Sequence, residues 1–421
     1  MIIINKIRSL INDNKNLVEN FTYLGLIQLF NLLLPLLTYP YLIQVLQVEI
    51  FGSIVFAQNL MSYFTIVINY GFNISGAKEV SIYRNDKAKI TEIVSSIIII
   101  KFIFWILALI LLIISLVVLN LRKEDFFLYI FSFSICFQEL LFPQWYFQGV
   151  EKMRFTTIIN LIIRVLFLVL IFLFVKEKSD YLLVPLFGGV GAFIGGIVSL
   201  YIIFFREKVN FKFQNINILT IYLKSSFALF ASDIVISLKD KLNVFFIGLF
   251  LGMKDVAIYD LGMKIVGLIL QLVNIVNNAI YPKVAVQKDM NFVKKITKYT
   301  FYVVSLFVFI LQIFIDNILY LFNQDLSEAI IPIRILLISP IIFSISFPMA
   351  HNCLVVFGKY KLLLIGMIIT SIFYLMLIYF GYLFQILDSI ISFAIITVLV
   401  YFIELIYRYF IIKKIMYETI M

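Results

Sequence analysis

The sequence predicts an all-α integral membrane protein of about twelve transmembrane helices, arranged as two six-helix lobes with a central cavity. Composition is the first observation behind this fold class. Of the 421 residues, 63% are hydrophobic and only 14% are charged, and the mean hydropathy is +1.07. A water-soluble globule cannot bury so much apolar surface, so the chain belongs in a lipid bilayer. The spacing of the apolar stretches and an internal repeat are the other two observations.

Long apolar stretches give the helices in order. A bilayer-spanning helix needs roughly 20 mostly apolar residues. Backbone polar groups in the hydrocarbon region must also be paired internally, which makes helices the expected spanning structures. Such stretches occur at 21–46, 52–76, 94–119, 126–148, 155–175, 181–205, 225–250, 257–281, 299–322, 329–356, 362–384 and 388–411. The connections between them are short, so specific function is expected among the helices.

The positions of Lys and Arg give an orientation. The N-terminus and every second connection carry 23 of these cations, whereas the opposite connections carry only five. The positive-inside rule therefore places both termini in the cytoplasm, which requires an even number of spans. The first stretch follows a polar leader and lacks a small-residue cleavage site, so we expect it to be retained as a span.

Several functional classes are not supported. The net charge of +10 is scattered over short loops, which favours contact with anionic lipid and argues against a nucleic-acid partner. One His and two Cys cannot supply a zinc site of the usual spacing, and no phosphate-binding loop occurs, so we expect no metal, no cofactor and no enzymatic activity. In the glycine-rich run 188–199, Gly191 and Gly195 are expected to allow close helix packing.

An internal repeat indicates the two lobes. When the chain is shifted by 205 positions, LQVEIFG (46–52) aligns with LGMKDVA (251–257). Polar residues then coincide in four pairs, Gln28 with Asp233, Asn69 with Asn274, Asn73 with Asn278 and Lys78 with Lys283. The shift predicts lobes of parallel topology at 1–215 and 216–421.

Polar stripes run along the first two helices of each predicted lobe. In the second and eighth spans, polar residues recur at steps of three and four, which places them on one side of a helix. The stripes consist of Gln28 and Asn31; Gln58, Ser62, Thr65, Asn69 and Asn73; Asp233, Ser237, Asp240 and Lys241; and Asp260, Lys264, Gln271, Asn274 and Asn278. We expect them to line one hydrated substrate cavity. For the uncharged positions, hydrogen bonding that holds the helices together is the competing interpretation.

Charged residues within the spans carry more information than the uncharged ones. A charge at mid-membrane costs about 2.5 to 3.5 kcal/mol on insertion scales, so it normally faces water, a partner or a substrate. Asp260 and Lys264 are spaced i, i+4 and could satisfy each other in part. Away from the stripes, cross-helix pairing is expected for Lys101, Glu139, Arg164, Lys239, Arg334 and Glu404. The single histidine, His351, is interpreted as a helix-packing residue.

The fourth span ends in PQWYFQGVEKMR (143–154). The proline predicts a break or kink in the helix. Aromatic residues at the end of a span are typical of the membrane interface, so Trp145 and Tyr146 are expected to anchor this helix there.

Three segments carry a family resemblance: TYPYLIQVLQVEIFGSIVFAQNL (38–60), NYGFNISGAKEVS (69–81) and PQWYFQGVEKMR (143–154). Together they resemble the bacterial O-antigen and polysaccharide-repeat flippases of the multidrug/oligosaccharidyl-lipid/polysaccharide exporter superfamily. GMKDVAIYDLGMK (252–264) and YPKVAV (281–286) agree in the second half. The chain departs from the family at Gln47, where such proteins usually have glycine, which bears on the conformation of the first outer turn.

The resemblance implies a V-shaped molecule of two six-helix bundles, whose cavity is bordered by the first two helices of each lobe. It also implies a substrate, an oligosaccharide unit linked through pyrophosphate to undecaprenol and moved from the inner to the outer leaflet of the cytoplasmic membrane by alternating access. We expect the amide and hydroxyl stripes to meet the sugar, and Lys241, Lys264 and Arg164 to offset the pyrophosphate charge.

Partners and coupling stay open at this point. Membrane lipids, a polysaccharide polymerase and other assembly proteins are the expected partners, and H⁺ or Na⁺ a candidate coupling ion. A second hypothesis keeps the fold but exports cationic drugs in exchange for Na⁺ or H⁺, using Asp233, Asp240 and Asp260. A third is a membrane polysaccharide polymerase or ligase, which would normally need a larger outer loop than this chain offers.

Overall fold

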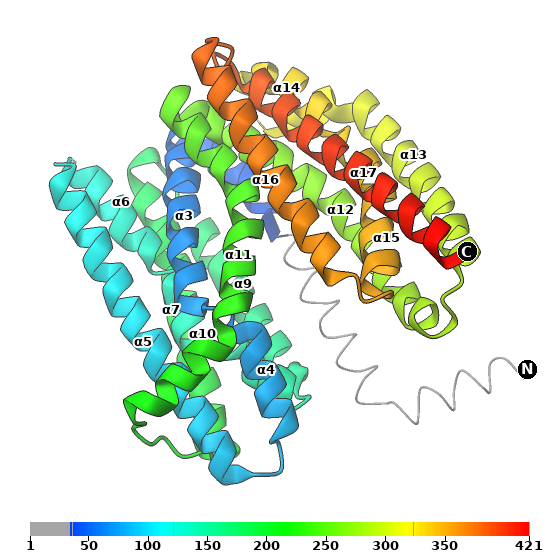
Figure 1. The fold of residues 1–421 in the computed structure, drawn as a ribbon. Coiled ribbons are helices and arrows are strands. Elements are labelled where there is room, and N and C mark those ends of the chain that lie inside the picture. Colours follow the sequence, from blue (N-terminus) through cyan, green and yellow to red (C-terminus); the bar gives the residue numbers. More distant parts are fainter. Residues whose placement is uncertain (1–33, 36, 121, 323, 421) are drawn as a thin grey trace, which may run out of the picture. The chain divides into compact units, whose positions relative to one another are not determined.

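The structure is a computed structural model, and it describes residues 34–35, 37–120, 122–322 and 324–420. Within these ranges every regular element is a helix, and eleven helices are long and apolar enough to cross a membrane (Figure 1). The predicted fold class of an all-α membrane protein is confirmed. Most of the predicted first span, 21–46, lies outside the described residues, although 37–46 is helical.

Most predicted spans agree closely with the observed helices. In the first half of the chain these are α3 (Val48–Asn69), α4 (Phe72–Ile82), α5 (Lys87–Val118), α6 (Lys123–Phe133), α7 (Cys136–Leu141), α8 (Gln144–Gly149), α9 (Met153–Phe174), η1 (Lys178–Leu182), α10 (Leu183–Tyr201) and η2 (Ile202–Arg206). In the second half they are α11 (Ile216–Phe250), α12 (Met253–Gln287), α13 (Met290–Phe322), η3 (Gln324–Ala329), α14 (Ile330–Leu336), α15 (Ser339–Met349), η4 (Ala350–Val355), α16 (Tyr360–Leu383) and α17 (Ile390–Ile420).

The chain divides into two compact units. Unit 1 comprises residues 1–38 and 57–234, and unit 2 comprises residues 39–56 and 235–421. Both α3 and α11 therefore run from one unit into the other. The predicted lobes, 1–215 and 216–421, stay a prediction.

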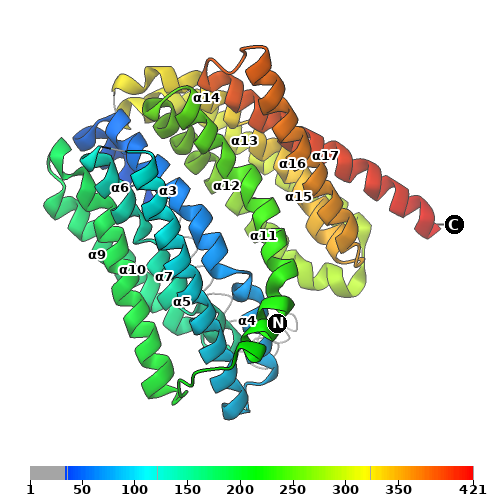
Figure 2. The same cartoon turned by 60° about the vertical axis from the view of Figure 1, so that its left-hand side comes forward.

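Unit 1 is built around α10, which lies against α9 and α7, and around α4, which lies against α8. The axes of α5, α7 and α10 are roughly parallel (Figure 2). A β-carbon on Gly191 or Gly195 of α10 would lie 2.8 or 2.0 Å from the side chain of Ile163 on α9. The predicted close packing through these two glycines is confirmed.

The interpretation of Trp145 and Tyr146 as interface anchors is wrong. The helix does break where expected, since α7 ends at Leu141 and α8 starts after Pro143. The two aromatic side chains, however, are only 1% and 2% exposed and belong to the core that α4, α5 and α8 share. The break at Pro143 redirects α8 inward, so its aromatic residues pack against α4 and α5 instead of the headgroup region.

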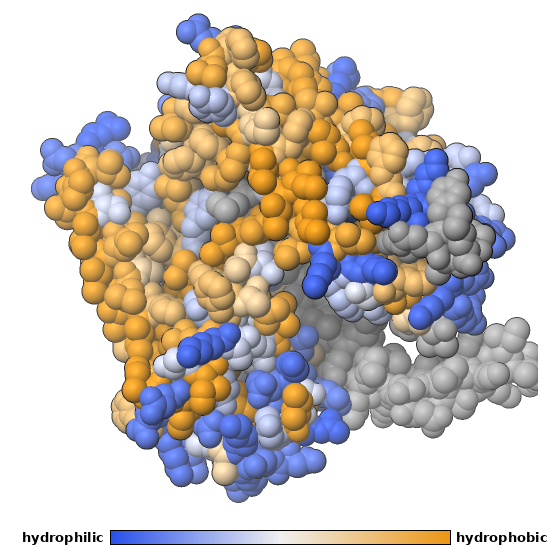
Figure 3. Space-filling view, in the orientation of Figure 1, coloured by the Kyte–Doolittle hydropathy of each residue, from blue (hydrophilic) through white to orange (hydrophobic). Residues whose placement is uncertain are grey.

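Lipid-facing surface is recognisable on the outside of unit 1. Apolar side chains of α5 stay 37–77% exposed along much of its length, among them Phe102, Leu111 and Val118. On the left of Figure 3 the flank of this helix is hydrophobic, with hydrophilic residues gathered at both ends. This distribution is that of a helix facing acyl chains in its middle and water at its ends.

Unit 2 contains α12 to α17 with the second half of α11. Here α15 lies against α13 and α17, and α12 lies against α14 and α15. A buried polar network ties four helices together: Asn243 of α11 donates to the hydroxyls of Tyr259 (2.7 Å) and Thr397 (3.1 Å), and accepts from Tyr374 (2.9 Å). Because each of these buried groups has a partner, the network costs little and fixes the register of the helices.

Candidate functional site

The polar stripe of unit 1 lies on α3 and α4, and much of it bonds locally. Gln58, Asn69 and Asn73 are half-buried. The backbone N–H of Asn73 donates to Oδ1 of Asn69 at 3.2 Å, across the break between α3 and α4. Asn69 thus satisfies one of the backbone donors that a helix start leaves unpaired.

The break itself is formed by two residues in the left-handed region. Tyr70 has φ 48° and Gly71 has φ 77°. A β-carbon on Gly71 would lie 2.8 Å from Cβ of Leu229 and 2.9 Å from the backbone nitrogen of Phe230, both on α11. Next to this contact the hydroxyls of Ser75 and Ser226 are 2.7 Å apart, and the rings of Tyr70 and Phe230 stack at 4.5 Å. Glycine lets α4 and the start of α11 approach closely.

The stripe of unit 2 lies on α12 and centres on Asp260. The hydroxyl of Tyr39 donates to Oδ2 of Asp260 at 2.8 Å, and Nζ of Lys264 lies 3.9 Å from Oδ1. The pairing predicted from the i, i+4 spacing is therefore present but loose. The Lys264 side chain is 44% exposed, against 17% for Asp260. A long ion pair on a half-exposed lysine contributes little stability and leaves the ammonium group able to bind another anion.

Further along α12, two faces of the helix differ in character. Asn277 is 1% exposed, donates to the Val273 carbonyl and accepts from Asn352 at 2.5 Å. On the stripe face, Gln271 and Asn274 are half-buried and Asn278 is exposed. The amide of Asn274 reaches Gln271 at 3.5 Å, whereas its buried Oδ1 has no hydrogen-bond partner among the described residues. The stripe face thus keeps polar capacity that packing does not use.

The remaining stripe residues are only partly placed. On α11, Asp233, Ser237 and Lys241 are half-buried, with Asp233 in unit 1 and the other two in unit 2. Gln28, Asn31 and the side chain of Asp240 lie outside the described residues. Within the units, the structure brings together Asn69 with Asn73, Asp260 with Lys264, and Gln271 with Asn274.

Cross-helix pairing is confirmed for two in-span cations. Nζ of the buried Lys101 on α5 donates to the Glu139 carbonyl of α7 at 3.1 Å and lies 3.6 Å from its carboxylate. Arg334 of α14 binds Asp316 of α13 through one nitrogen at 2.9 and 3.1 Å. Only the first pair involves a buried charge, since the Lys101 side chain is 2% exposed whereas Arg334 and Asp316 are 43% and 48% exposed. Removing Glu139 would leave the Lys101 charge uncompensated, which typically costs about 3–5 kcal/mol, whereas an exposed pair is worth about 0–1 kcal/mol.

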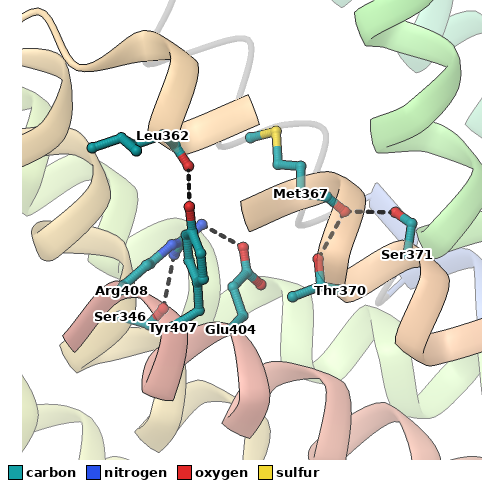
Figure 4. A network of polar contacts seen from close by, with 8 residues as sticks. All are labelled: Ser346, Leu362, Met367, Thr370, Ser371, Glu404, Tyr407 and Arg408. Atoms are coloured by element: carbon teal, nitrogen blue, oxygen red, sulfur yellow. Dashed lines mark hydrogen bonds and ion pairs between the residues drawn. The ribbon is translucent and has the colours of Figure 1, made fainter. Parts of the chain in front are cut away.

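Glu404 forms an ion pair within its own helix. The cation is Arg408, one turn further along α17, and both side chains are nearly buried (Figure 4). Arg408 itself crosses to α15, where it donates to the Ser346 hydroxyl at 2.8 Å. The helical i, i+4 spacing places Arg408 within reach of Glu404 on one face of α17.

Two other in-span groups differ in their surroundings. His351 packs between the rings of Tyr281 and Phe347, with centroids 4.7 and 5.3 Å away, so its interpretation as a packing residue is confirmed. Arg164 is half-buried, and its buried Nε has no hydrogen-bond partner among the described residues. The side chain of Lys239 lies outside the described residues.

In the part of the chain that the structure describes, no three His, Cys, Asp or Glu residues are grouped to hold a metal.

Tyr39 is a site residue that the sequence argument missed. It lies 221 positions from Asp260, and no helical spacing relates the two. Its position within the segment 38–60 that resembles the flippases was the one available signal.

Comparison with known proteins identifies the family of this chain. The family model described as "Polysaccharide biosynthesis protein" matches residues 17–288. The chain belongs to this family. It is 31% identical over 288 residues to a protein of Escherichia coli (strain K12) named "Putative O-antigen transporter", covering 67% of this chain and 68% of the relative. A protein of the same name from Shigella dysenteriae is 27% identical over 286 residues, covering 67% and 70%.

Solved structures agree on the fold. The lipid II flippase MurJ in an inward closed conformation aligns with a TM-score of 0.69 at 14% identity, covering 94% of this chain and 87% of MurJ. An inward-facing MATE multidrug resistance transporter of the MOP superfamily aligns with a TM-score of 0.64 at 15% identity, covering 90% and 98%. At these identities the likeness establishes the shared fold and nothing more.

Proposed function

We propose that the protein is a flippase that moves undecaprenyl-pyrophosphate-linked oligosaccharide repeat units from the inner to the outer leaflet of the bacterial cytoplasmic membrane. Membership of the polysaccharide biosynthesis family and the relatives named as O-antigen transporters support this class of substrate. The observation that carries the proposal is the stripe on α12, where the Lys264 side chain is 44% exposed and Oδ1 of Asn274 has no hydrogen-bond partner among the described residues.

The headgroup sets the physical problem. Sugar hydroxyls and a charged pyrophosphate cannot enter hydrocarbon without their hydrogen bonds, whereas the prenyl chain is stable there. Amides such as Gln271, Asn274 and Asn278 both donate and accept, which suits hydroxyl-rich sugar. Together with Gln58, Asn69 and Asn73, they are proposed to replace the water around the oligosaccharide.

The pyrophosphate is proposed to meet the cations. Lys264 is held about one helical turn from Asp260, and the Tyr39 hydroxyl occupies the other carboxylate oxygen. This arrangement orients Lys264 without neutralising it fully, so its ammonium group can exchange a long contact for charge-assisted bonds to phosphate. Lys241 and Arg164 are the further candidates, the latter because its Nε has no partner among the described residues.

Translocation is proposed to proceed by alternating access, with the prenyl tail staying in lipid while the two lobes expose the polar stripes to one side and then to the other. The excess of Lys and Arg on alternate connections supports a cytoplasmic location for both termini. The coupling ion is left open.

Complementation of a flippase-null strain tests the assignment of Lys264. Loss of a charge-assisted contact typically costs about 1.5–3 kcal/mol, so Lys264→Ala should lower surface polysaccharide about tenfold or more at equal expression. Lys254→Ala is the matched control on the same helix, because Lys254 pairs with the exposed Glu328 and lies off the stripe. Full activity of both Lys264→Ala and Lys241→Ala would refute the proposed phosphate contacts.

The competing functions give different phenotypes in the same strain. A flippase defect leaves single repeat units in the inner leaflet, whereas a polymerase or ligase defect leaves them in the outer leaflet. Drug resistance on overexpression, without any effect on polysaccharide, would favour the multidrug exporter. That hypothesis uses the carboxylates of Asp233, Asp240 and Asp260, and of these Asp260 already accepts a hydrogen bond from Tyr39.

A further inference from the structure

A pocket of unit 2 lies apart from the polar stripes. It has a volume of about 290 Å³ and lies between the start of α13, α15, η4 and α17. This volume is at the lower end of the range for small-molecule sites. The lining is mostly apolar, with Lys294, Thr297 and Lys298 as its polar members; the others are Met290, Val293, Phe301, Ile345, Met349, Cys353 and Ile412.

The pocket follows from the local helix geometry. After Pro348 the fourth helix of this half continues as the π-helix η4, whose wider turn displaces Cys353 toward α13, where its sulfur lies 3.6 Å from that of Met290. Behind the lining, Arg408 holds α17 to Ser346 of α15, next to Ile345 (Figure 4). Protein interiors are packed to high density, so a hollow of this size with a mostly apolar lining calls for an apolar occupant.

Charge marks one end of the pocket. Lys294 and Lys298 lie one turn apart on α13, both are exposed, and neither has an ion-pair partner among the described residues. Lys413 and Lys414 follow Ile412 on α17 and are exposed as well. Like charges at i, i+4 repel each other, so an anion between Lys294 and Lys298 would relieve that repulsion.

Neighbouring aromatic residues indicate how deep in the membrane the lysine end of the pocket lies. Tyr299 and Tyr302 on the next turns of α13 are 57% and 54% exposed, as is typical of the membrane interface. Five cations gather at 282–298, the connection that the positive-inside rule places in the cytoplasm. An amphiphile seated here would have its anionic group at headgroup level on the cytoplasmic side.

We propose that this pocket binds an anionic glycerophospholipid of the inner leaflet, with part of one acyl chain in the apolar hollow and the phosphate between Lys294 and Lys298. The apolar hollow ends at two cations that have no ion-pair partner among the described residues, although Lys298 also lies over the Tyr302 ring at 5.9 Å, and this combination matches such a lipid in both charge and shape. The site lies apart from the stripe residues and does not rest on the proposed flippase activity.

Native mass spectrometry of the full-length protein in detergent tests this site, with phosphatidylglycerol and phosphatidylethanolamine added at equal concentration. The wild type should retain phosphatidylglycerol preferentially. Each lysine beside an anionic headgroup contributes about fivefold in affinity, so Lys294→Gln/Lys298→Gln should lose about twentyfold and with it the preference. Ile345→Trp, which fills the hollow and keeps both lysines, should lower retention of both lipids.

The matched control is Lys295→Gln/Lys359→Gln, which removes the same charge from exposed lysines that do not line the pocket. Its preference for phosphatidylglycerol should change less than twofold. An equal loss in this control would mean a diffuse surface potential and would overturn the site. Equal retention of both lipids by the wild type, or displacement of phosphatidylglycerol by a tenfold lower concentration of polyprenyl phosphate, would overturn the proposed occupant.

Discussion

The second span of each half, Val48–Ile82 and Met253–Gln287, shows how one sequence pattern gives two backbones. At the 205-residue offset the helix starts coincide, since α3 begins at Val48 and α12 at Met253. The residues before them, Gln47 and Gly252, both have positive φ, 70° and 131°. The first helix then breaks at Tyr70 and Gly71, whereas α12 continues without a break for 35 residues.

The difference lies in what each helix meets. Val276 occupies the position in α12 that Gly71 occupies in the first half, and a side chain is tolerated there because it is 37% exposed. Gly71 instead lies against the backbone of α11, where no β-carbon fits. Equal polar patterns therefore do not require equal backbones, and one close helix contact is enough to bend a span.

The largest expected effect tests this contact. Gly71→Ala would place a β-carbon 2.9 Å from the Phe230 nitrogen and impose a left-handed conformation on a residue that resists it. Overpacking and the backbone penalty together predict a loss of about 2–4 kcal/mol in unfolding free energy, measured by SDS titration in mixed micelles. In the unbroken helix α12, Val276→Gly should cost only about 1 kcal/mol. Comparable losses would show that Gly71 does not determine the bend.

The fourth spans extend the comparison. Phe142–Pro143 and Phe347–Pro348 coincide at the same offset, but only the first pair interrupts its helix. In the first half the chain leaves the helix at Phe142 and re-enters it as α8, whereas in the second half α15 passes through Pro348 into the π-helix η4. A proline removes one backbone donor in both cases, and the two halves accommodate that loss differently.

The second prediction concerns the turn before α12. Gly252 has φ 131° and ψ 179°, a region that is open essentially to glycine alone, and no atom lies within 4 Å of an added β-carbon. Gly252→Ala should therefore cost about 1–3 kcal/mol from backbone strain alone. The same SDS titration measures it, with Gly267→Ala as control, because Gly267 is also uncrowded but lies within the helix. A loss no greater than that of the control would mean that the turn relaxes to another conformation.

Local patterns were predictable from the sequence to the extent that a single helix determines them. The length of the apolar stretches located eleven spans, and the i, i+4 spacing predicted the ion pair between Asp260 and Lys264. Contacts between distant helices were not predictable, because no spacing relates Tyr39 to Asp260. The burial of Trp145 likewise depends on how far the break at Pro143 turns α8, which an aromatic cluster at the end of a span does not reveal.

The smallest expected effect completes the comparison at the start of α3. Gln47 is exposed and adopts φ 70°, the left-handed conformation in which glycine is favoured. Gln47→Gly removes a backbone penalty of about 1–2 kcal/mol but adds about 0.5–1 kcal/mol of chain entropy to the unfolded state. A gain of up to about 1 kcal/mol in the same titration is therefore expected, opposite in sign to Gly252→Ala. A loss of stability would mean that the Gln47 side chain makes a stabilising contact. The turns at Gln47 and Gly252 would then coincide at the 205-residue shift but be stabilised in different ways.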